Sequence, residues 1–214
     1  MKVIKQVSTT LLAVAVLGVP LMTLAANQGK GFGRQSMDAD TSLDATEIQN
    51  LNYMREEEKL ARDVYRTLYG IWGLPVFDNI SESEQVHTTR VEDMLDKYRL
   101  PDPVVDDTTG VFVDQELAVL YDTLVAEGSQ SSLKALYVGA AIEEIDMIDL
   151  QHAIDDTDNV DIQMLYENLM SGSKNHLRAY VGQIENLGIV YEAQYLPQDE
   201  VDSIVDSPVE RGRR

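Results

Sequence analysis

The chain has 214 residues, of which 44% are hydrophobic and 25% are charged, and its net charge at pH 7 is -20. This composition indicates a globular protein with enough apolar residues for one packed domain, and it excludes a largely disordered chain. The acidic balance argues against binding to nucleic acids or to anionic membrane surfaces, because both require basic side chains. It suits a mild attraction for cations.

The cysteine count limits the chemistry further. The sequence contains no cysteine, which excludes disulfides, thiolate catalysis, iron–sulfur clusters and cysteine-ligated zinc. Any bound metal must be held by oxygen and imidazole ligands, which favours iron, manganese or zinc.

Residues 1–26 are interpreted as a secretory signal peptide. Two lysines precede an apolar run at 11–24, and the small residues Ala25 and Ala26 follow it. The run is short for a membrane span and typical of a signal sequence, with an uncleaved anchor as the alternative. We expect cleavage after one of these alanines, no membrane span in the mature chain, and export to a periplasm or the cell exterior.

A flexible linker is predicted over residues 27–42, and a first long helix is predicted from near Ser42 or Asp44 to Gly70. Within this helix lies an acidic run of three glutamates. Glu56 is expected to face solvent. Glu57 and Glu58 flank the apolar face on opposite sides, so that helical periodicity does not choose between them as inward-facing residues.

A second helix is predicted over residues 80–98, antiparallel to the first because the connection is short. Glu84 and His87 are three residues apart, so they share one helix face, and that face is otherwise apolar. A buried carboxylate and a buried imidazole are costly unless they are compensated. A metal ion is one compensation, and a salt bridge between the two or to a neighbouring helix is the other.

A long connection over residues 99–130 follows, with helical spacing at 115–126. The third long helix is predicted from Ser131 or Ser132 to Ile154. Glu144 lies within its apolar face and Glu143 at the margin of that face. Asp146 and Asp149 are expected to point outward, and His152 is interpreted as a surface residue.

The fourth long helix is predicted over residues 160–187, where Gly188 stops it. His176 lies on its apolar face. No segment shows the alternation of a strand, so the predicted fold class is all-α, with four long helices and a helix-containing crossover between the second and the third. The helical domain is assigned to residues 43–196 and a charged C-terminal tail to 197–214.

Each long helix therefore carries a polar ligand candidate near its middle. Any one of them alone is more often structural, but four helices in agreement favour a metal site in a shared core. The candidates are Glu58 or Glu57, the pair Glu84 and His87, Glu144, and His176.

The sequence resembles the ferritin-like diiron-carboxylate superfamily. Glu58, Ala61, Arg62 and Tyr65 are similar to the Glu-x-x-Ala-Arg-x-x-Tyr pattern of rubrerythrins, and Glu84-Gln-Val-His87 matches the motif of the second helix. The resemblance implies a ferritin-like four-helix bundle and favours Glu58 over Glu57. It implies metal ligands at Glu58, Glu84, His87, Glu144 and His176, with Tyr65 and Ser173 beside them.

The chain also resembles a narrower group, the domain-of-unknown-function family 2202, over about residues 44–196. The similar segments begin with Met54-Arg-Glu-Glu-Glu-Lys, Ser83-Glu-Gln-Val-His87 and Gly172-Ser-Lys-Asn-His. That family carries no established activity. Where the superfamily has glutamate three residues before the last histidine, this chain has Ser173. One ion, an asymmetric pair of ions, or a metal-free cluster are the alternatives.

The function that the resemblance implies is a non-haem iron oxidoreductase that uses dioxygen or peroxide, with Tyr65 as a hydrogen-bond donor to a ligand. Iron is the expected cofactor, as one or two ions, with manganese or zinc as alternatives. A module that sequesters metal without turnover and a metal-free interaction domain are the competing hypotheses. The oligomeric state is left open, with a homodimer among the alternatives.

Overall fold

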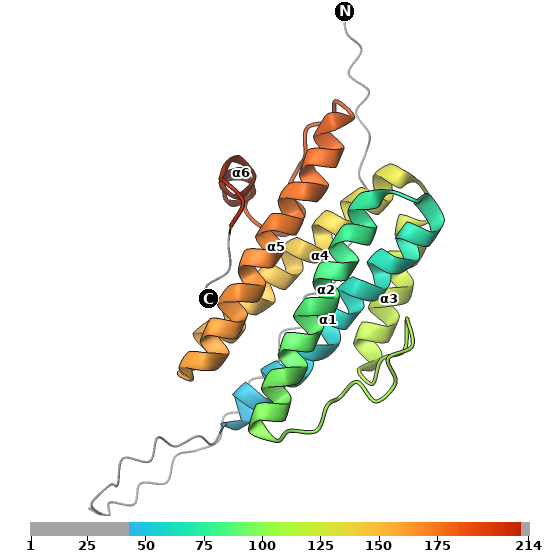
Figure 1. The fold of residues 1–214 in the computed structure, drawn as a ribbon. Coiled ribbons are helices and arrows are strands. Elements are labelled where there is room, and N and C mark those ends of the chain that lie inside the picture. Colours follow the sequence, from blue (N-terminus) through green and yellow to red (C-terminus); the bar gives the residue numbers. More distant parts are fainter. Residues whose placement is uncertain (1–42, 211–214) are drawn as a thin grey trace, which may run out of the picture. The chain divides into compact units, whose positions relative to one another are not determined.

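The computed structural model describes residues 43–210, which form six α-helices and no strand (Figure 1). The all-α prediction is confirmed for this part of the chain. The predicted signal peptide (1–26) and linker (27–42) lie outside the described residues. None of the described helices is long and apolar enough to cross a membrane.

The first two helices form an antiparallel pair with clear sequence signals at their ends. Helix α1 (Ala45–Trp72) begins at Asp44, whose side chain accepts hydrogen bonds from the backbone of Thr46 and Glu47. It runs past the predicted end at Gly70 and stops at Gly73, which has the left-handed φ of 63°. Helix α2 (Pro75–Tyr98) follows at once, with proline in its first turn.

The remaining helices are α3 (Gln115–Gly128), α4 (Ser132–Asp155), α5 (Val160–Asn186) and α6 (Gln198–Asp206). Helix α6 lies in the segment that was assigned to a charged tail. Its Val201 and Ile204 side chains are buried. Arg178 of α5 donates hydrogen bonds to the Ile204 carbonyl (2.6 Å) and to the Ser207 hydroxyl (2.6 Å). This part of the C-terminal segment is therefore docked on α5.

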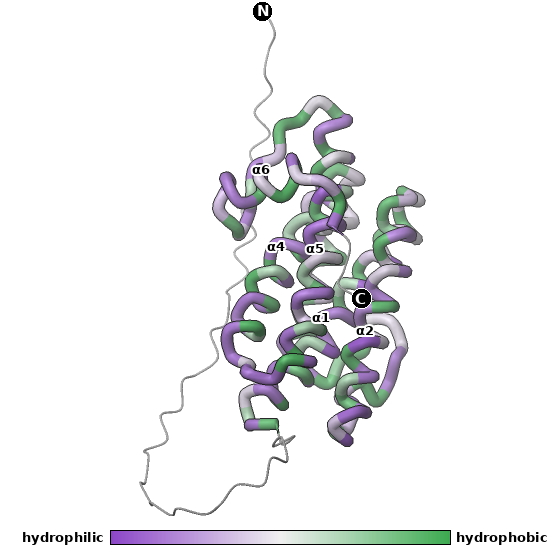
Figure 2. The backbone as a smooth tube through the Cα atoms, turned by 60° about the vertical axis from the view of Figure 1, so that its left-hand side comes forward, coloured by the Kyte–Doolittle hydropathy of each residue, from purple (hydrophilic) through white to green (hydrophobic). Residues whose placement is uncertain are grey.

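The four long helices close a ring around one core. Helix α1 contacts α2 and α4, and α5 contacts the same two helices, while α3 packs on α1 and α4 and α6 packs on α5 (Figure 1). Hydrophobic and hydrophilic residues alternate along these helices (Figure 2). Such amphipathic helices bury one face against their neighbours.

The core consists of two apolar layers with a polar layer between them. One apolar layer draws on all four long helices: Leu51, Met54, Val91, Leu95, Leu150, Ala153, Ile162, Leu165, Tyr166 and Leu169. The other contains Tyr65, Phe77 and Tyr180, whose ring centroids lie 5.4–6.2 Å apart. The acidic and imidazole side chains that were predicted near the middle of each helix lie between these two apolar layers.

Helix α1 is unusual because every residue from Met54 to Tyr65 is buried, including seven charged ones. The connection between α2 and α3 lies over this helix and supplies the partners. Arg55 donates to Asp102 (2.9 Å), and Arg62 donates to Asp107 (2.7 Å). Lys59 donates to the backbone carbonyl of residue 108 (3.0 Å) and to a carboxylate one turn later, that of residue 63 (2.6 Å).

Glu56 corrects the expectation of a solvent-facing side chain. It is 4% exposed, and its two carboxylate oxygens accept backbone N–H groups from Val113 (2.6 Å) and Asp114 (3.0 Å). The connection covers the face of α1 on which Glu56 lies. Helical periodicity identifies the core face of a helix, but it does not reveal that another segment covers the opposite face.

Replacing Glu56 by alanine is expected to lower the free energy of unfolding by about 2 kcal/mol, because two partly buried N–H groups lose their acceptor. Glu82→Ala is the matched control, since Glu82 is an exposed glutamate on α2. Denaturant unfolding followed by circular dichroism measures both. Equal stability of the two variants would contradict the structural role of Glu56.

Candidate metal centre

Carboxylates and imidazoles from the four long helices meet in the polar layer. Helix α1 supplies Glu58, α2 supplies Glu84 and His87, and α5 supplies His176. None of these side chains is more than 8% exposed. Ligand atoms of Glu84, His87 and His176 all lie within 4.8 Å of one another. The structure thus brings together four of the five residues that the resemblance implied.

Glu84 is the centre of this cluster. One of its carboxylate oxygens lies 2.7 Å from Nδ1 of His87, and the other lies 2.7 Å from Nδ1 of His176. Each imidazole nitrogen also faces a second carboxylate. Glu58 lies 3.3 Å from Nδ1 of His87, and Glu143 lies 3.4 Å from Nδ1 of His176. The arrangement is nearly symmetrical about Glu84.

The candidate on α4 is therefore Glu143 rather than Glu144. Glu144 is fully buried, but it faces the segment after α5. It accepts the Tyr191 hydroxyl (2.5 Å) and the backbone N–H groups of Gln194 (2.9 Å), Tyr195 (2.6 Å) and Leu196 (2.8 Å). Because that segment covers the outer side of α4, both sides of the helix are buried, and the position of Glu144 within the apolar face did not place it in the cluster.

Asp146 corrects a second expectation, because it does not point outward. It is 6% exposed, and its Oδ2 lies 2.5 Å from the Ser173 hydroxyl. Ser173 is the residue that stands where a glutamate was expected. The adjacent Gly172 allows the His87 ring to approach α5, since a Cβ there would lie 2.4 Å from a ring carbon. His152 is exposed, as predicted.

Two hydrogen bonds orient the cluster from outside. The Tyr65 hydroxyl donates to Glu143 (2.5 Å). Nε2 of His176 lies 2.8 Å from the Ser83 hydroxyl. When that nitrogen carries the ring proton, the lone pair of Nδ1 faces the carboxylates, which is the arrangement that metal-ligating histidines adopt. Sequence reasoning missed Ser83. The only available signal was its position one turn before His87.

Glu57, the other residue of the unresolved pair on α1, lies apart from the imidazoles. Its neighbours are Asp149 and Asp146 of α4. Burial, followed by repulsion from these two carboxylates, raises the pKa of Glu57 well above its ordinary value. The structure therefore places Glu58 with His87, and Glu57 on the side of α1 that packs against α4.

The charges of the cluster compensate one another. Burial alone would raise the pKa of Glu84, but the imidazoles of His176 and His87 outweigh burial and lower it. Burial alone would lower the pKa of His176, but Glu84 and Glu143 raise it to about 10. Burial raises the pKa of Glu58 to about 8 against the opposing effect of His87. Without metal, the neighbouring carboxylates therefore favour the protonated form of both imidazoles.

Several atoms of the cluster have no hydrogen-bond partner, which is compatible with a bound metal ion. Nδ1 of His87 and Nδ1 of His176 have no hydrogen-bond partner despite their short distances to carboxylates, and Glu58 Oε1 has none either. Two ligands at right angles around an ion, each about 2.1 Å from it, lie about 3.0 Å apart. The observed separations of 2.7–3.4 Å bracket that value.

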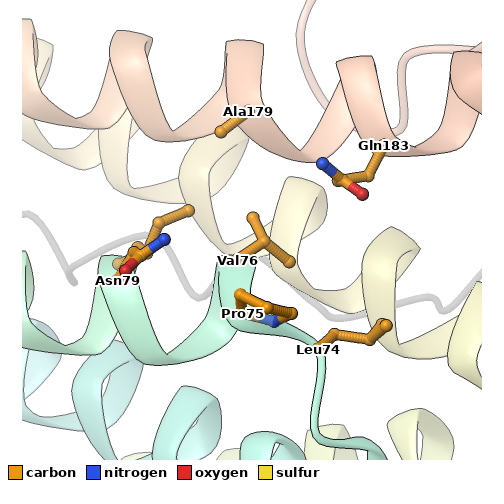
Figure 3. Close-up of a pocket in the computed structure, with 7 residues that line it drawn as sticks. Leu74, Pro75, Val76, Asn79, Ala179 and Gln183 are labelled. Atoms are coloured by element: carbon orange, nitrogen blue, oxygen red, sulfur yellow. The ribbon is translucent and has the colours of Figure 1, made fainter.

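A pocket elsewhere in the molecule has a different character. It lies between the start of α2 and the second half of α5 (Figure 3). Its lining is mostly apolar and contains no ionisable side chain: Leu74, Pro75, Val76, Asn79, Ile80, Ala179 and Gln183. None of the clustered carboxylates or histidines lines it, so it supplies no ligand to the candidate centre.

Fold and site define an all-α protein with carboxylates and imidazoles clustered in its core, a donor set compatible with metal binding. The model of the uncharacterized protein domain DUF2202 matches residues 47–208, and the chain belongs to this family. The uncharacterized protein MJ0754 of Methanocaldococcus jannaschii is 51% identical over 166 residues, which cover 78% of this chain and 90% of the relative. The crystal structure of hypothetical protein MJ0754 superposes with a TM-score of 0.77 at 46% identity, covering 85% of this chain and all of that one.

Metal-free protein is expected to lose stability between pH 4.5 and pH 10, from Glu58 up to about pH 8 and from His176 between pH 6.5 and about pH 10. The folded state keeps protons on His176 and Glu58 that the unfolded chain has released. Their stabilising contribution is complete below the unfolded pKa values and is lost as pH rises through the folded ones. In the presence of chelator, Tm should fall by roughly 5 °C from pH 6 to pH 9.

His176→Gln should flatten this pH dependence, because it removes one of the two groups. His152→Gln, at an exposed histidine of α4, is the control and should keep the wild-type slope. A wild-type Tm that rises over the same pH range would refute the assignment of these protons.

Proposed function

We propose that this protein is a ferritin-like metal-binding protein whose preferred metal is iron, and that it acts as a non-haem iron oxidoreductase. The observation that carries the proposal is the pair of unpartnered imidazole nitrogens facing one shared carboxylate. Further support comes from the helix order, with its long connection between α2 and α4, and from the mid-helix position of every donor.

The arrangement around Glu84 divides into two halves, and each half would hold one divalent ion. Glu58 and His87 would bind the first ion, and Glu143 and His176 would bind the second. Glu84 would be shared, since one of its oxygens faces each histidine. Carboxylate and imidazole donors suit iron and also manganese or zinc, so the identity of the native ion is proposed rather than fixed by the donors.

Bound iron would supply one-electron chemistry with dioxygen or peroxide. Neighbouring residues would hold the metal-ligating side chains in place and exclude bulk water from the site. Tyr65 holds the Glu143 carboxylate through its hydroxyl, and the Ser83 hydroxyl forms a hydrogen bond with Nε2 of His176. The cluster lies between two apolar layers. Export to a periplasm or the cell exterior and the assembly state stay predictions from the sequence.

Anaerobic titration with ferrous iron is expected to give two bound ions per chain and a rise in Tm that chelator reverses. Glu84→Ala should remove the bridging ligand and abolish tight binding at both positions. His87→Ala should lower the stoichiometry to one. His152→Ala is the matched histidine control. Less than one bound equivalent in the wild type, or a Tm insensitive to metal and chelator, would refute the proposal in favour of a metal-free helical domain.

Metal binding without turnover is the second candidate. It is favoured by the described pocket, because none of its lining residues belongs to the cluster. Oxygen consumption separates the two functions. We expect ferrous iron to be oxidised with dioxygen uptake faster than the uncatalysed rate, and Glu84→Ala to return the rate to that baseline. Stoichiometric binding with only baseline uptake would identify a sequestering protein.

A further inference from the structure

Asp146 is a buried carboxylate outside the cluster described above. That cluster consists of five donors: Glu58, Glu84, His87, Glu143 and His176. Its Oδ2 lies 2.5 Å from the Ser173 hydroxyl, whereas its Oδ1 has no hydrogen-bond partner. The side chain is 6% exposed. A buried carboxylate oxygen without a partner is costly, so this atom requires an explanation.

The helix geometry places this carboxylate at the edge of the cluster. Asp146 follows Glu143 by three residues on α4, and Ser173 precedes His176 by three residues on α5. Residues three apart share a helix face. The contact between Asp146 and Ser173 therefore joins the same two helices as the contact between Glu143 and His176, one turn away.

The charged neighbours of Asp146 agree with this position. Burial is the main cause that raises its pKa, and the carboxylates of Glu58, Glu143 and Glu84 raise it further. These three neighbours are the same three glutamates that carry the proposed ions. Asp146 thus faces the interior of the ring of helices and not its surface.

We propose that Asp146 is a sixth metal ligand, supplied by α4 in place of the carboxylate that α5 lacks, and that the Ser173 hydroxyl positions it. The inference rests on the proposed function, because it assigns a further ligand to that site. Serine at position 173 carries no charge, but its hydroxyl holds one oxygen of the aspartate and leaves the other free to bind an ion.

Charge balance supports this assignment. Two divalent ions bring four positive charges into the core, and Glu58, Glu84 and Glu143 bring three negative charges. Asp146 supplies the fourth, which brings the six donors and the two ions to zero net charge. A net charge in a buried site is strongly disfavoured, so a neutral donor set is the more stable one.

Asp146→Asn tests the assignment directly. Asparagine keeps the shape of the side chain and can still accept the Ser173 hydrogen bond, but it loses the charge. We expect wild-type protein titrated anaerobically with cobalt(II) to bind two ions. The variant should keep one ion and bind the second at least ~10-fold more weakly, with a changed visible absorption of the bound cobalt. Asp149→Asn, one turn further along α4, is the matched control and should behave as the wild type.

Ser173→Ala tests whether Asp146 is a metal ligand or only a hydrogen-bond acceptor that joins α4 to α5. It removes the hydrogen bond but leaves the Asp146 charge, so it should weaken the second ion less than Asp146→Asn does. If Asp146 only ties α4 to α5, Asp146→Asn should bind both ions as the wild type does, and that result overturns the inference. Equal weakening by Ser173→Ala and Asp146→Asn overturns it as well.

The failure of this inference is distinguishable from failure of the proposed function. If Glu84→Ala abolishes cobalt binding while Asp146→Asn leaves stoichiometry and affinity unchanged, the metal site stands and Asp146 is not part of it. If the wild type binds no cobalt, both fail. Circular dichroism of each variant verifies that the helices are intact.

Discussion

The carboxylate of Glu84 can be buried because an imidazole from α2 and an imidazole from α5 both approach it at 2.7 Å. This constraint sets the register of the helices that surround the core. A shift of α5 along α2 by one turn would remove His176 from Glu84 and leave an uncompensated charge among apolar layers. Glu143 then fixes α4 against α5 in the same way, through its contact with His176.

Helix α1 shows that this core compensates buried charge in two distinct ways. On its inner side, Glu58 faces an imidazole and shares the cluster with two other carboxylates. On its outer side, basic and acidic residues pair with one another and with the connection between α2 and α3. The outer contacts are direct hydrogen bonds, apart from Nε of Arg55, which has no partner. In the inner cluster, Nδ1 of His87, Nδ1 of His176 and Oε1 of Glu58 have no hydrogen-bond partner, which is compatible with a ligand there.

The sequence predicted the helices well because their signals are local. Capping residues and glycines mark their ends, and the spacing of apolar residues identifies the inward face that carries Glu84, His87 and His176. The errors occurred at Glu56, Asp146 and Glu144. Glu56 and Glu144 lie on helix faces that are covered by another segment, the connection for Glu56 and the segment after α5 for Glu144. Asp146 instead lies one turn from Glu143 and faces α5. Helical periodicity describes one buried face, and it does not reveal a second one that a distant segment creates.

The connection that covers α1 has a consequence for the order of folding. All of its charged contacts with α1 join residues 40–60 apart, within the first two helices and the connection itself. The contact between Glu84 and His176 instead spans 92 positions of the sequence. Because nearby segments meet sooner than distant ones, the N-terminal half can satisfy the outer charges of α1 before α5 has been synthesised. The imidazole–carboxylate cluster is then completed later, when α5 packs against α2.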